Sequence, residues 1–235
     1  MIFAAGKGTR LKPITDTMPK ALVPVSGKPL LQHVIDKLEA SGIGSMVVNV
    51  HHFADQIKDY LRGTGISISD ESDILLETGG GLKKARPLFA FDTPVLIHNV
   101  DIFSNVDLRD FYDNNAGHDA TLLVSPRKTS RYLLVDKQSK RLMGWTNIDT
   151  GEVRTPHADL DISTCERYAF AGIHLFSPAL FPLMDQWPER FSIIDFYLKH
   201  CAERDIYCHI KQDLKLLDVG KMDTLEQAET FAKAF

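Results

Sequence analysis

The fold class of this chain is decided by residues 2–11, Ile2-Phe3-Ala4-Ala5-Gly6-Lys7-Gly8-Thr9-Arg10-Leu11. A short apolar run enters a glycine-rich turn, in which small residues let backbone N–H groups approach an anion closely. Leu11 stands where a dinucleotide-binding fingerprint has its third glycine, and no Gly-Lys-Ser/Thr sequence closes the turn as a P-loop. The stretch therefore predicts a first strand followed by an anion-binding loop of another kind.

The loop that follows is cationic and stiff, although the chain as a whole is acidic. Its 27 Lys and Arg residues against 31 Asp and Glu give a formal net charge of −4. Cations nevertheless gather in this segment: Lys7, Arg10, Lys12 and Lys20. Prolines 13, 19 and 24 disfavour a regular helix here. A loop of this kind after the first strand is suited to a triphosphate, with a solvated charged loop as the structural alternative.

Strand-like and helix-like segments alternate outward from this loop, which is typical of an α/β sheet with helices on its faces. Apolar runs predict strands at Met46–Val50, Val95–Asn99 and Thr121–Ser125. Apolar residues at helical spacing predict a helix over 30–38, and the glycines at 79–81 are expected to lead into a helix that starts near Leu82.

The second half of the chain changes character. Two apolar runs, Tyr132–Asp136 and Arg141–Trp145, flank a connection of hairpin length, and residues 146–166 are polar enough to predict loops or an edge hairpin. Further strands are expected at Tyr168–Phe176 and Leu214–Leu217. No repeat or linker interrupts the chain, so we expect one continuous α/β domain.

The loop belongs to a longer pattern, Ala4-Ala5-Gly6-x-Gly8-Thr9-Arg10-Leu11-x-Pro13-x-Thr15-x-x-x-Pro19-Lys20-Ala21-Leu22-x-Pro24-Val25. This pattern closely resembles the signature of the sugar-1-phosphate nucleotidyltransferases. The likeness continues through Glu77–Gly81, Asn99–Asp101, Tyr168–Gly172 and Asp218–Gly220. Within the family it is most similar to the N-acetylmuramate-1-phosphate uridylyltransferases, and enzymes of the mannose-1-phosphate guanylyltransferase type are similar too.

The resemblance implies a Rossmann-like mixed, mostly parallel sheet flanked by helices, the nucleotide-diphospho-sugar transferase fold. It implies a single domain over residues 1–235, with a nucleotide-binding half at about 1–125 and a sugar-binding half at about 126–235. It also implies a reaction in which a sugar-1-phosphate oxygen attacks the α-phosphorus of a nucleoside triphosphate. Two anions meet in such a step, so positioning and cations do most of the work.

The resemblance assigns the parts of the site residue by residue. Arg10 would neutralise the β- and γ-phosphates, and Lys20 would hold the attacking phosphate. The nucleotide-binding residues would be Ala5, Gly6, Gly8, Thr9, Arg10, Asn49, Glu77, Thr78 and Gly79. The sugar-binding residues would be Asn99, Gly144, Tyr168 and Gly172. Packing and turn formation are the structural alternatives for most of these.

Two aspartates are expected to hold Mg²⁺ as a cofactor. Asp101 follows the apolar strand Val95–Asn99, and Asp218 follows Leu214–Leu217 in the same way. If these strands are parallel neighbours, both carboxylates lie at one edge of the sheet and suit a Mg²⁺ ion shared with phosphate oxygens. Asp after a strand is more often a turn or cap residue, so the pairing carries the prediction. The family usually has glycine where this chain has Val100, which puts metal geometry or activity in doubt.

Composition excludes several other classes of protein. A weakly acidic chain without a basic run is unsuited to nucleic acid, and its short apolar runs cannot span a membrane. Three cysteines without a CxxC pair fit a reducing compartment, and no secretory signal precedes the first strand, so we expect a cytoplasmic protein. Adjacent His51 and His52 point to opposite faces of an extended chain and predict no zinc site.

The leading hypothesis is a nucleotidyltransferase that uses a nucleoside triphosphate, with UTP expected, and a sugar-1-phosphate. We expect a monomer or a homodimer. A guanylyl- or cytidylyltransferase with another acceptor is one alternative. A nucleotide-sugar-binding module without catalysis is a second alternative, which Val100 favours and the presence of Arg10, Lys20, Asp101 and Asp218 opposes.

Overall fold

A computed structural model describes residues 1–90, 92–220 and 222–232 of the chain. Its main sheet has ten strands, and two small two-stranded sheets lie beside it. The main-sheet strands are β1 (Ile2–Phe3), β4 (Val47–Val50), β5 (Ser67–Asp70), β6 (Val95–Asn99), β8 (Ala120–Ser125), β9 (Arg131–Asp136), β10 (Leu142–Asn147), β11 (Val153–Arg154), β12 (Cys165–Phe176) and β13 (Ile206–Ile210). The small sheets pair β2 (Pro24–Val25) with β3 (Lys28–Pro29), and β7 (Ile102–Ser104) with β14 (Leu216–Asp218).

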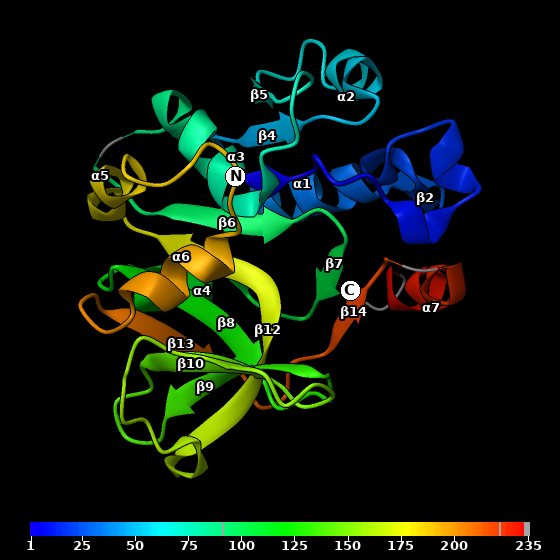
Figure 1. Cartoon of the computed structure of the whole chain (residues 1–235). Helices are drawn as coiled ribbons and strands as arrows, with labels where there is room; N and C mark the ends of the chain where they lie inside the picture. Colours follow the sequence, from blue (N-terminus) through cyan, green and yellow to red (C-terminus); the bar gives the residue numbers. More distant parts are fainter. Residues whose placement is uncertain (91, 221, 233–235) are drawn as a thin grey trace.

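Four parallel strands, β5, β4, β1 and β6, build the part of the sheet that carries the glycine-rich loop (Figure 1). Phe3 at the end of β1 is in register with Asn49 on β4 and with Asn99 on β6. The carboxyl ends of these strands therefore lie side by side, which is where open α/β sheets bind ligands.

The long strand β12 joins the two halves of the molecule. It pairs antiparallel with β6, β8 and β9, and its register shifts between Phe170 and His174. Gly172 lies in this irregular stretch with a φ of +73°, a conformation that favours glycine. One continuous hydrogen-bonded sheet thus runs from β5 through β12 to the β9–β10 hairpin. Of segment 146–166, the ends belong to β10 and β12, and β11 adds a short edge strand.

The main sheet separates the core into two layers, and helices pack against both of its faces. They are α1 (Leu30–Ala40), α2 (Ala54–Tyr60), α3 (Glu77–Ala85), α4 (Leu108–Asn115), α5 (Phe181–Met184), α6 (Ile193–His200) and α7 (Met222–Ala232). Successive strand residues alternate between the layers, because side chains on a strand point to opposite faces. Ile2 packs with the buried face of α1, whereas Phe3 packs with α3 and α6. In the described residues, no helix is long and apolar enough to cross a membrane.

Most expected elements are confirmed, and three details differ. The predicted helix over 30–38, the strands at 95–99 and 121–125 and the 132–145 hairpin are all present. The helix α3 begins at Glu77, not near Leu82, so its glycines lie within the helix. The last strand, β14, begins at Leu216 and pairs antiparallel with β7 instead of joining a parallel sheet.

Candidate active site

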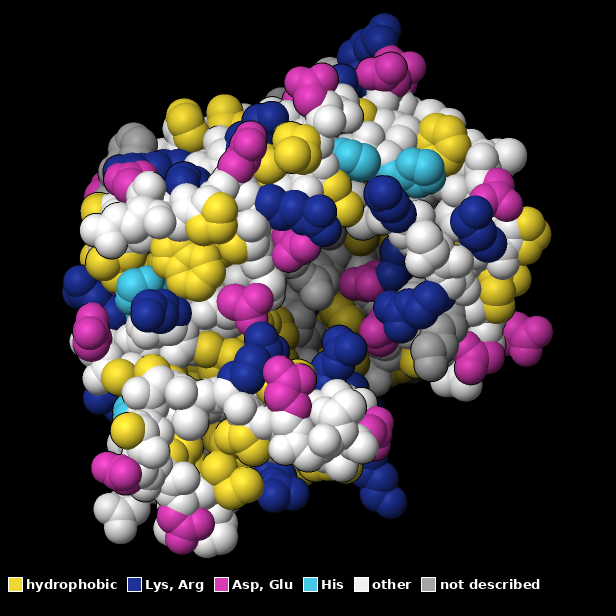
Figure 2. All heavy atoms as spheres, viewed as in Figure 1, with side chains coloured by type: hydrophobic (Ala, Val, Ile, Leu, Met, Phe, Trp, Pro, Cys, Tyr) yellow, Lys and Arg dark blue, Asp and Glu magenta, His cyan; other side chains and the backbone are white. Residues whose placement is uncertain are grey.

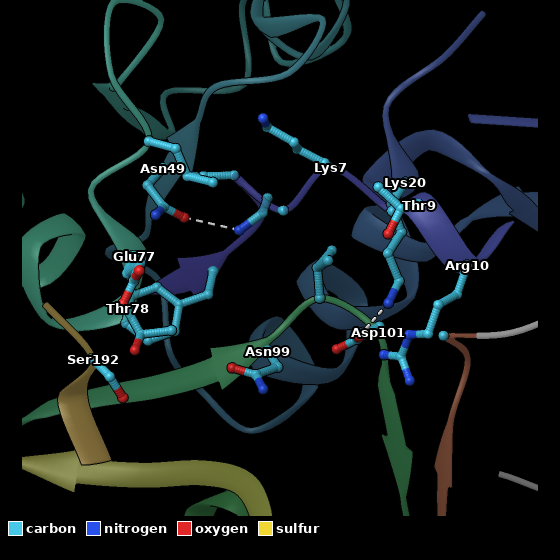
Figure 3. Close-up of a pocket in the computed structure, with 18 residues that line it drawn as sticks. Lys7, Thr9, Arg10, Lys20, Asn49, Glu77, Thr78, Asn99, Asp101 and Ser192 are labelled. Atoms are coloured by element: carbon cyan, nitrogen blue, oxygen red, sulfur yellow. Dashed lines mark hydrogen bonds and ion pairs between the residues drawn. The ribbon is translucent and has the colours of Figure 1, made fainter. Parts of the chain in front are cut away.

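A cavity of about 610 Å³ opens at the carboxyl ends of β1, β4 and β6. Figure 2 shows the molecule hollowed at its centre, with basic and acidic side chains around the opening. The sequence-predicted residues that line this cavity are Ala5, Gly6, Gly8, Thr9, Arg10, Lys20, Asn49, Glu77, Thr78, Asn99 and Asp101. The structure thus brings together most of the residues expected from the sequence (Figure 3).

The loop after β1 is held in shape by its glycine and by short hydrogen bonds. Gly8 has a φ of +63°, and its carbonyl accepts from the Leu11 amide at 2.8 Å and from the Thr15 hydroxyl at 2.9 Å. A Cβ at this position would stand only 2.9 Å from side-chain atoms of Thr15 and Lys20. Three single turns of 3₁₀ helix, at 9–11, 14–16 and 20–22, replace a regular helix, so the loop stays open toward the cavity.

Asn49 anchors the start of this loop. Its Oδ1 accepts from the Ala4 amide at 2.8 Å, and its Nδ2 donates to Glu71 Oε1 at 2.7 Å. Glu71 is fully buried, and this burial raises the pKa of its carboxyl, against the lowering effect of the Asn49 hydrogen bond. The sequence analysis missed Glu71, because an acidic residue just after a strand carries no signal of burial. Because Glu71 binds the Asn49 amide that holds Ala4, it is a positioning residue for the loop.

The segment expected beside the nucleobase is fastened to the chain that precedes α6. The Ile193 amide donates to Thr78 Oγ1 at 2.9 Å, and the Gly79 amide donates to the Phe191 carbonyl at 2.9 Å. A Cβ on Gly79 or Gly80 would collide with Phe191 or with the Glu189 carbonyl. The close approach of these two segments explains why glycines occur inside α3. Gly79 consequently does not line the cavity, and its amide already donates to the Phe191 carbonyl.

The Glu77 side chain adds a second contact with the chain that precedes α6. Its φ is +62°, which is uncommon for a residue with a side chain. Its carboxylate accepts from Arg190 at 2.9 Å. Glu77 therefore lines the cavity while its charge is paired with Arg190.

Opposite charges meet on the other side of the cavity. The Lys20 ammonium donates to Asp101 Oδ2, and both side chains are largely buried. Asp218 lies next to them: a Cβ on Gly220 would be 2.6 Å from Asp218 Oδ1 and 2.9 Å from Arg10 Nη2. Burial and the nearby Asp101 raise the pKa of the Asp218 carboxyl, and the cations of Lys20 and Arg10 oppose that shift.

The two aspartates come together by a different route from the expected one. Asp101 directly precedes β7, and Asp218 ends β14, the antiparallel partner of β7. Asp218 pairs with Ile102, and the Val219 amide donates to the Asp101 carbonyl at 2.8 Å. The antiparallel register, rather than two parallel strand ends, therefore holds the carboxylates as neighbours. Two adjacent carboxylates that repel each other fit a divalent cation shared with phosphate oxygens.

Val100 does not disturb this arrangement. Its side chain is buried in the core layer that contains α1, and its amide donates to the Phe3 carbonyl at 3.1 Å. Its φ is not positive. A valine is therefore accommodated here without the backbone conformation that would require glycine.

The residues expected to bind the sugar divide into two groups. Asn99 lines the cavity, and Gly172 packs against it, since a Cβ there would be 2.7 Å from Asn99 Nδ2. Gly144 and Tyr168 do not line the cavity: Gly144 packs against the Arg154 carbonyl, and the Tyr168 hydroxyl donates to Glu166 at 3.1 Å. A role for these two in sugar binding remains a prediction.

Arg127 adds a cation that the sequence analysis missed. It follows β8, and its Nη2 donates to the Phe170 carbonyl of β12 at 2.9 Å. Partial burial lowers the pKa of its guanidinium, and the charge of Asp218 opposes this shift. In the described part of the chain it forms no ion pair with a carboxylate within 4.0 Å. It therefore presents further donors near Asp218.

The strand order diverges at β1, and a cationic cavity of small-molecule size with two neighbouring carboxylates lies at this point. This arrangement is typical of nucleotide-binding α/β proteins. Comparison with known families places this chain more narrowly. Residues 1–234 match the family described as nucleotidyl transferase, and the chain belongs to that family.

Individual relatives agree with this assignment. The chain is 46% identical over 108 residues to N-acetylmuramate alpha-1-phosphate uridylyltransferase of Caulobacter vibrioides, covering 43% of this chain and 44% of the relative. It is 29% identical over 252 residues to UTP–glucose-1-phosphate uridylyltransferase of Synechocystis, covering 97% of this chain and 61% of the relative. The chain thus spans less than two thirds of the length of these relatives.

A solved structure confirms the expected fold. A putative glucose-1-phosphate thymidylyltransferase from Bacillus anthracis, in complex with sucrose, matches with a TM-score of 0.79. The sequences are 18% identical, and the match covers 100% of this chain and 94% of that one.

Proposed function

We propose that this protein transfers a nucleotidyl group from a nucleoside triphosphate to a sugar-1-phosphate. The observation that carries the proposal is the convergence of four charged side chains, Arg10, Lys20, Asp101 and Asp218, at one cavity of about 610 Å³. An oxygen of the sugar phosphate attacks the α-phosphorus, and the bond from that phosphorus to the bridging oxygen breaks. Pyrophosphate leaves with the bonding electron pair, so no protein nucleophile is needed.

The chain's own cations manage the charge in this step. The loop after β1 offers backbone amides and Arg10 to the triphosphate, while Lys20 neutralises an oxygen of the attacking phosphate. In the free protein Lys20 supplies the positive charge beside Asp101, so the carboxylate is not left uncompensated. Binding of phosphates would draw Lys20 toward the substrate.

We also propose Mg²⁺ as the cofactor, held by Asp101 and Asp218. When bound, the ion would supply positive charge that lowers the repulsion between the two phosphorylated substrates. The pKa of the Asp218 carboxyl, which burial and the nearby negative charge of Asp101 raise, supports a cation-binding role for these two neighbouring carboxylates.

The same proposal extends to the setting of the enzyme. We propose one catalytic domain over residues 1–235, in which about 1–125 hold the nucleotide and about 126–235 the sugar. A monomer or a homodimer in the cytoplasm fits the weakly acidic composition and the three unpaired cysteines. The partners are small phosphorylated molecules, without nucleic acid or membrane.

UTP is expected to be the preferred donor. Thr78 and Ser192 line the cavity, and the close contact of Gly79 and Gly80 with the backbone of residues 189–191 lies behind them, so this wall cannot easily yield to a purine. Uridylyltransferases among the relatives support the same choice. Pyrophosphate release, measured for four nucleoside triphosphates against several sugar-1-phosphates, is expected to give kcat/KM for UTP about tenfold or more above that for GTP. Faster turnover with GTP on every acceptor would favour the guanylyltransferase alternative.

Arg127 is expected to bind the acceptor phosphate. Its guanidinium interacts with the charge of Asp218 and uses one donor on the Phe170 carbonyl, which belongs to the half of the chain proposed to hold the sugar. Replacement by Gln removes the charge and keeps a polar group. We therefore expect Arg127→Gln to raise the acceptor KM about tenfold while the KM for UTP stays within about twofold. Lys128→Gln, a neighbouring exposed cation, is the matched control. An unchanged acceptor KM in Arg127→Gln would rule out this contact.

A further inference from the structure

One buried carboxyl group joins two walls of the active-site cavity. The first wall is the glycine-rich loop, residues 4–10, and the second is the segment that leads into α3, residues 75–78, which we call the α3 entry. Both segments line the cavity. Glu71 directly follows β5, is fully buried, and accepts hydrogen bonds that connect it with each of them.

The first connection runs through Asn49 to the loop. Glu71 Oε1 accepts from Asn49 Nδ2 at 2.7 Å, and Asn49 Oδ1 accepts from the Ala4 amide at 2.8 Å (Figure 3). The side-chain amide of an asparagine has a donor end and an acceptor end. Because Glu71 binds the donor end, the oxygen of Asn49 stays turned toward Ala4.

The second connection leads directly to the α3 entry. Glu71 Oε2 accepts from the Leu76 amide at 3.3 Å. Leu76 is 1% exposed, and its neighbours on both sides line the cavity. Gly81 leaves room for this arrangement, since a Cβ there would be 2.6 Å from Glu71 Oε1 and 2.9 Å from Asn49 Nδ2. The Glu71 carboxyl is therefore closely packed between β4 and α3.

The two donors fit an ionised carboxylate. Burial raises the pKa of the Glu71 carboxyl, and the nearby charge of Asp70 raises it further. The hydrogen bonds from Asn49 and Leu76 and the charge of Lys84 act in the opposite direction. A carboxylate has two acceptor oxygens and satisfies both donors at once, whereas a glutamine has one acceptor and one donor. An amide in this place would therefore leave one wall without its hydrogen bond.

We propose that Glu71 is a positioning residue that sets the spacing between the glycine-rich loop and the α3 entry. A nucleoside triphosphate would contact the loop with its phosphates and the α3 entry with its base, so its affinity would depend on this spacing. An anion that reaches only the loop would depend on it less. The inference rests on the proposed function, because it takes the cavity to hold a nucleotide.

Glu71→Gln tests the spacing with two probes. The preferred nucleoside triphosphate, expected to be UTP, reports on both walls, and inorganic tripolyphosphate reports on the loop alone. Calorimetry on the whole chain is expected to show about a tenfold or larger loss of affinity for the nucleotide and less than about a threefold loss for tripolyphosphate. Glu39→Gln, an exposed residue at the end of α1, is the matched control and is expected to change neither affinity.

The outcomes separate this inference from the proposed function. Nucleotide affinity in Glu71→Gln equal to that of the native protein would overturn the inference alone. An equal loss for both probes would also overturn it, because Glu71 would then shape only the loop. A native protein that bound none of the four nucleoside triphosphates would overturn the proposed function and the inference together.

An exchange of donor and acceptor distinguishes the hydrogen bonds from a general loss of packing. Asn49→Asp alone brings two carboxyl groups into contact, and they can bond only by taking up a proton. In Asn49→Asp/Glu71→Gln, the new amide can donate to the new carboxylate and accept from the Leu76 amide. The new carboxylate can still accept from the Ala4 amide. All three hydrogen bonds are then possible again.

The double variant is therefore expected to bind the nucleotide about tenfold or more tightly than Asn49→Asp alone. Both variants carry the same new carboxylate at the cavity, so its repulsion of phosphates cancels in this comparison. Circular dichroism checks that each variant folds. A folded double variant that binds the nucleotide no more tightly than Asn49→Asp would show that these hydrogen bonds do not set the spacing, and the inference would be wrong.

Discussion

Replacement of Lys20 by methionine is expected to lower turnover about ten- to a hundredfold while leaving triphosphate affinity nearly intact. Lys20 is 8% exposed and its ammonium binds Asp101, so its charge acts at the centre of the cavity. Methionine keeps much of the length and apolar surface of the lysine and removes the charge. The measurement is pyrophosphate release at several acceptor concentrations, with nucleotide binding followed separately.

A matched control lies on the same loop. Lys12 pairs with Asp16 at 2.9 Å, but its side chain is 60% exposed, and such surface pairs contribute little. Lys12→Met is therefore expected to keep near-native turnover. Circular dichroism of both variants checks folding, since Lys20→Met leaves Asp101 without its partner. Near-native turnover of Lys20→Met at modest acceptor concentration would show that Lys20 does not hold the attacking phosphate.

The parts of this site that lie within one segment were predictable from the sequence. Gly8 needs its positive φ within a single turn, and Lys20 and Arg10 follow on the same stiff loop. Asn49 and Asn99 were also predictable, because each lies where a parallel strand ends and the register then aligns them across β1. Local spacing and strand periodicity carry this kind of information.

Contacts between distant segments were not predictable in the same way. The glycines of α3 looked like a flexible entry to a helix, yet they lie inside it because the backbone around Phe191 packs directly on them. Arg127 reaches the Phe170 carbonyl through the pairing of β8 with β12, and its interaction with Asp218 on β14 depends on tertiary packing. Glu71 becomes a buried partner of Asn49 only once β5 lies beside β4. In each case the tertiary packing, not the local pattern, determines the role of the residue.

The pairing of the two aspartates combines both kinds of information. Each aspartate follows an apolar run in the sequence, but the two aspartates are 117 positions apart, which is the difference between 218 and 101. The register of β7 with β14 makes them neighbours, and the Val219 amide ties one turn to the other through the Asp101 carbonyl. The carboxylates therefore belong to one unit, and a change in either is expected to affect the other.

Substitution of either carboxylate by an amide is expected to abolish nearly all turnover. Asp101→Asn and Asp218→Asn keep the shape of the side chain and remove the negative charge proposed to hold Mg²⁺. Each single variant is expected to lose about a thousandfold or more in kcat, as mutations of groups that act as a unit do. Thermal unfolding checks that both variants fold, and Asp107→Asn, an N-cap outside the cavity, is the control for an Asp-to-Asn change.

The double variant distinguishes a shared role from two separate ones. If Asp101 and Asp218 hold one ion, the first substitution already removes it, and the second has little left to lose. The double variant is therefore expected to lie within about tenfold of the weaker single variant. Multiplicative losses would mean that the two aspartates act independently. Native Mg²⁺-dependent activity in Asp218→Asn would exclude that residue from the site, and the β7–β14 pair would then serve only to position Asp101.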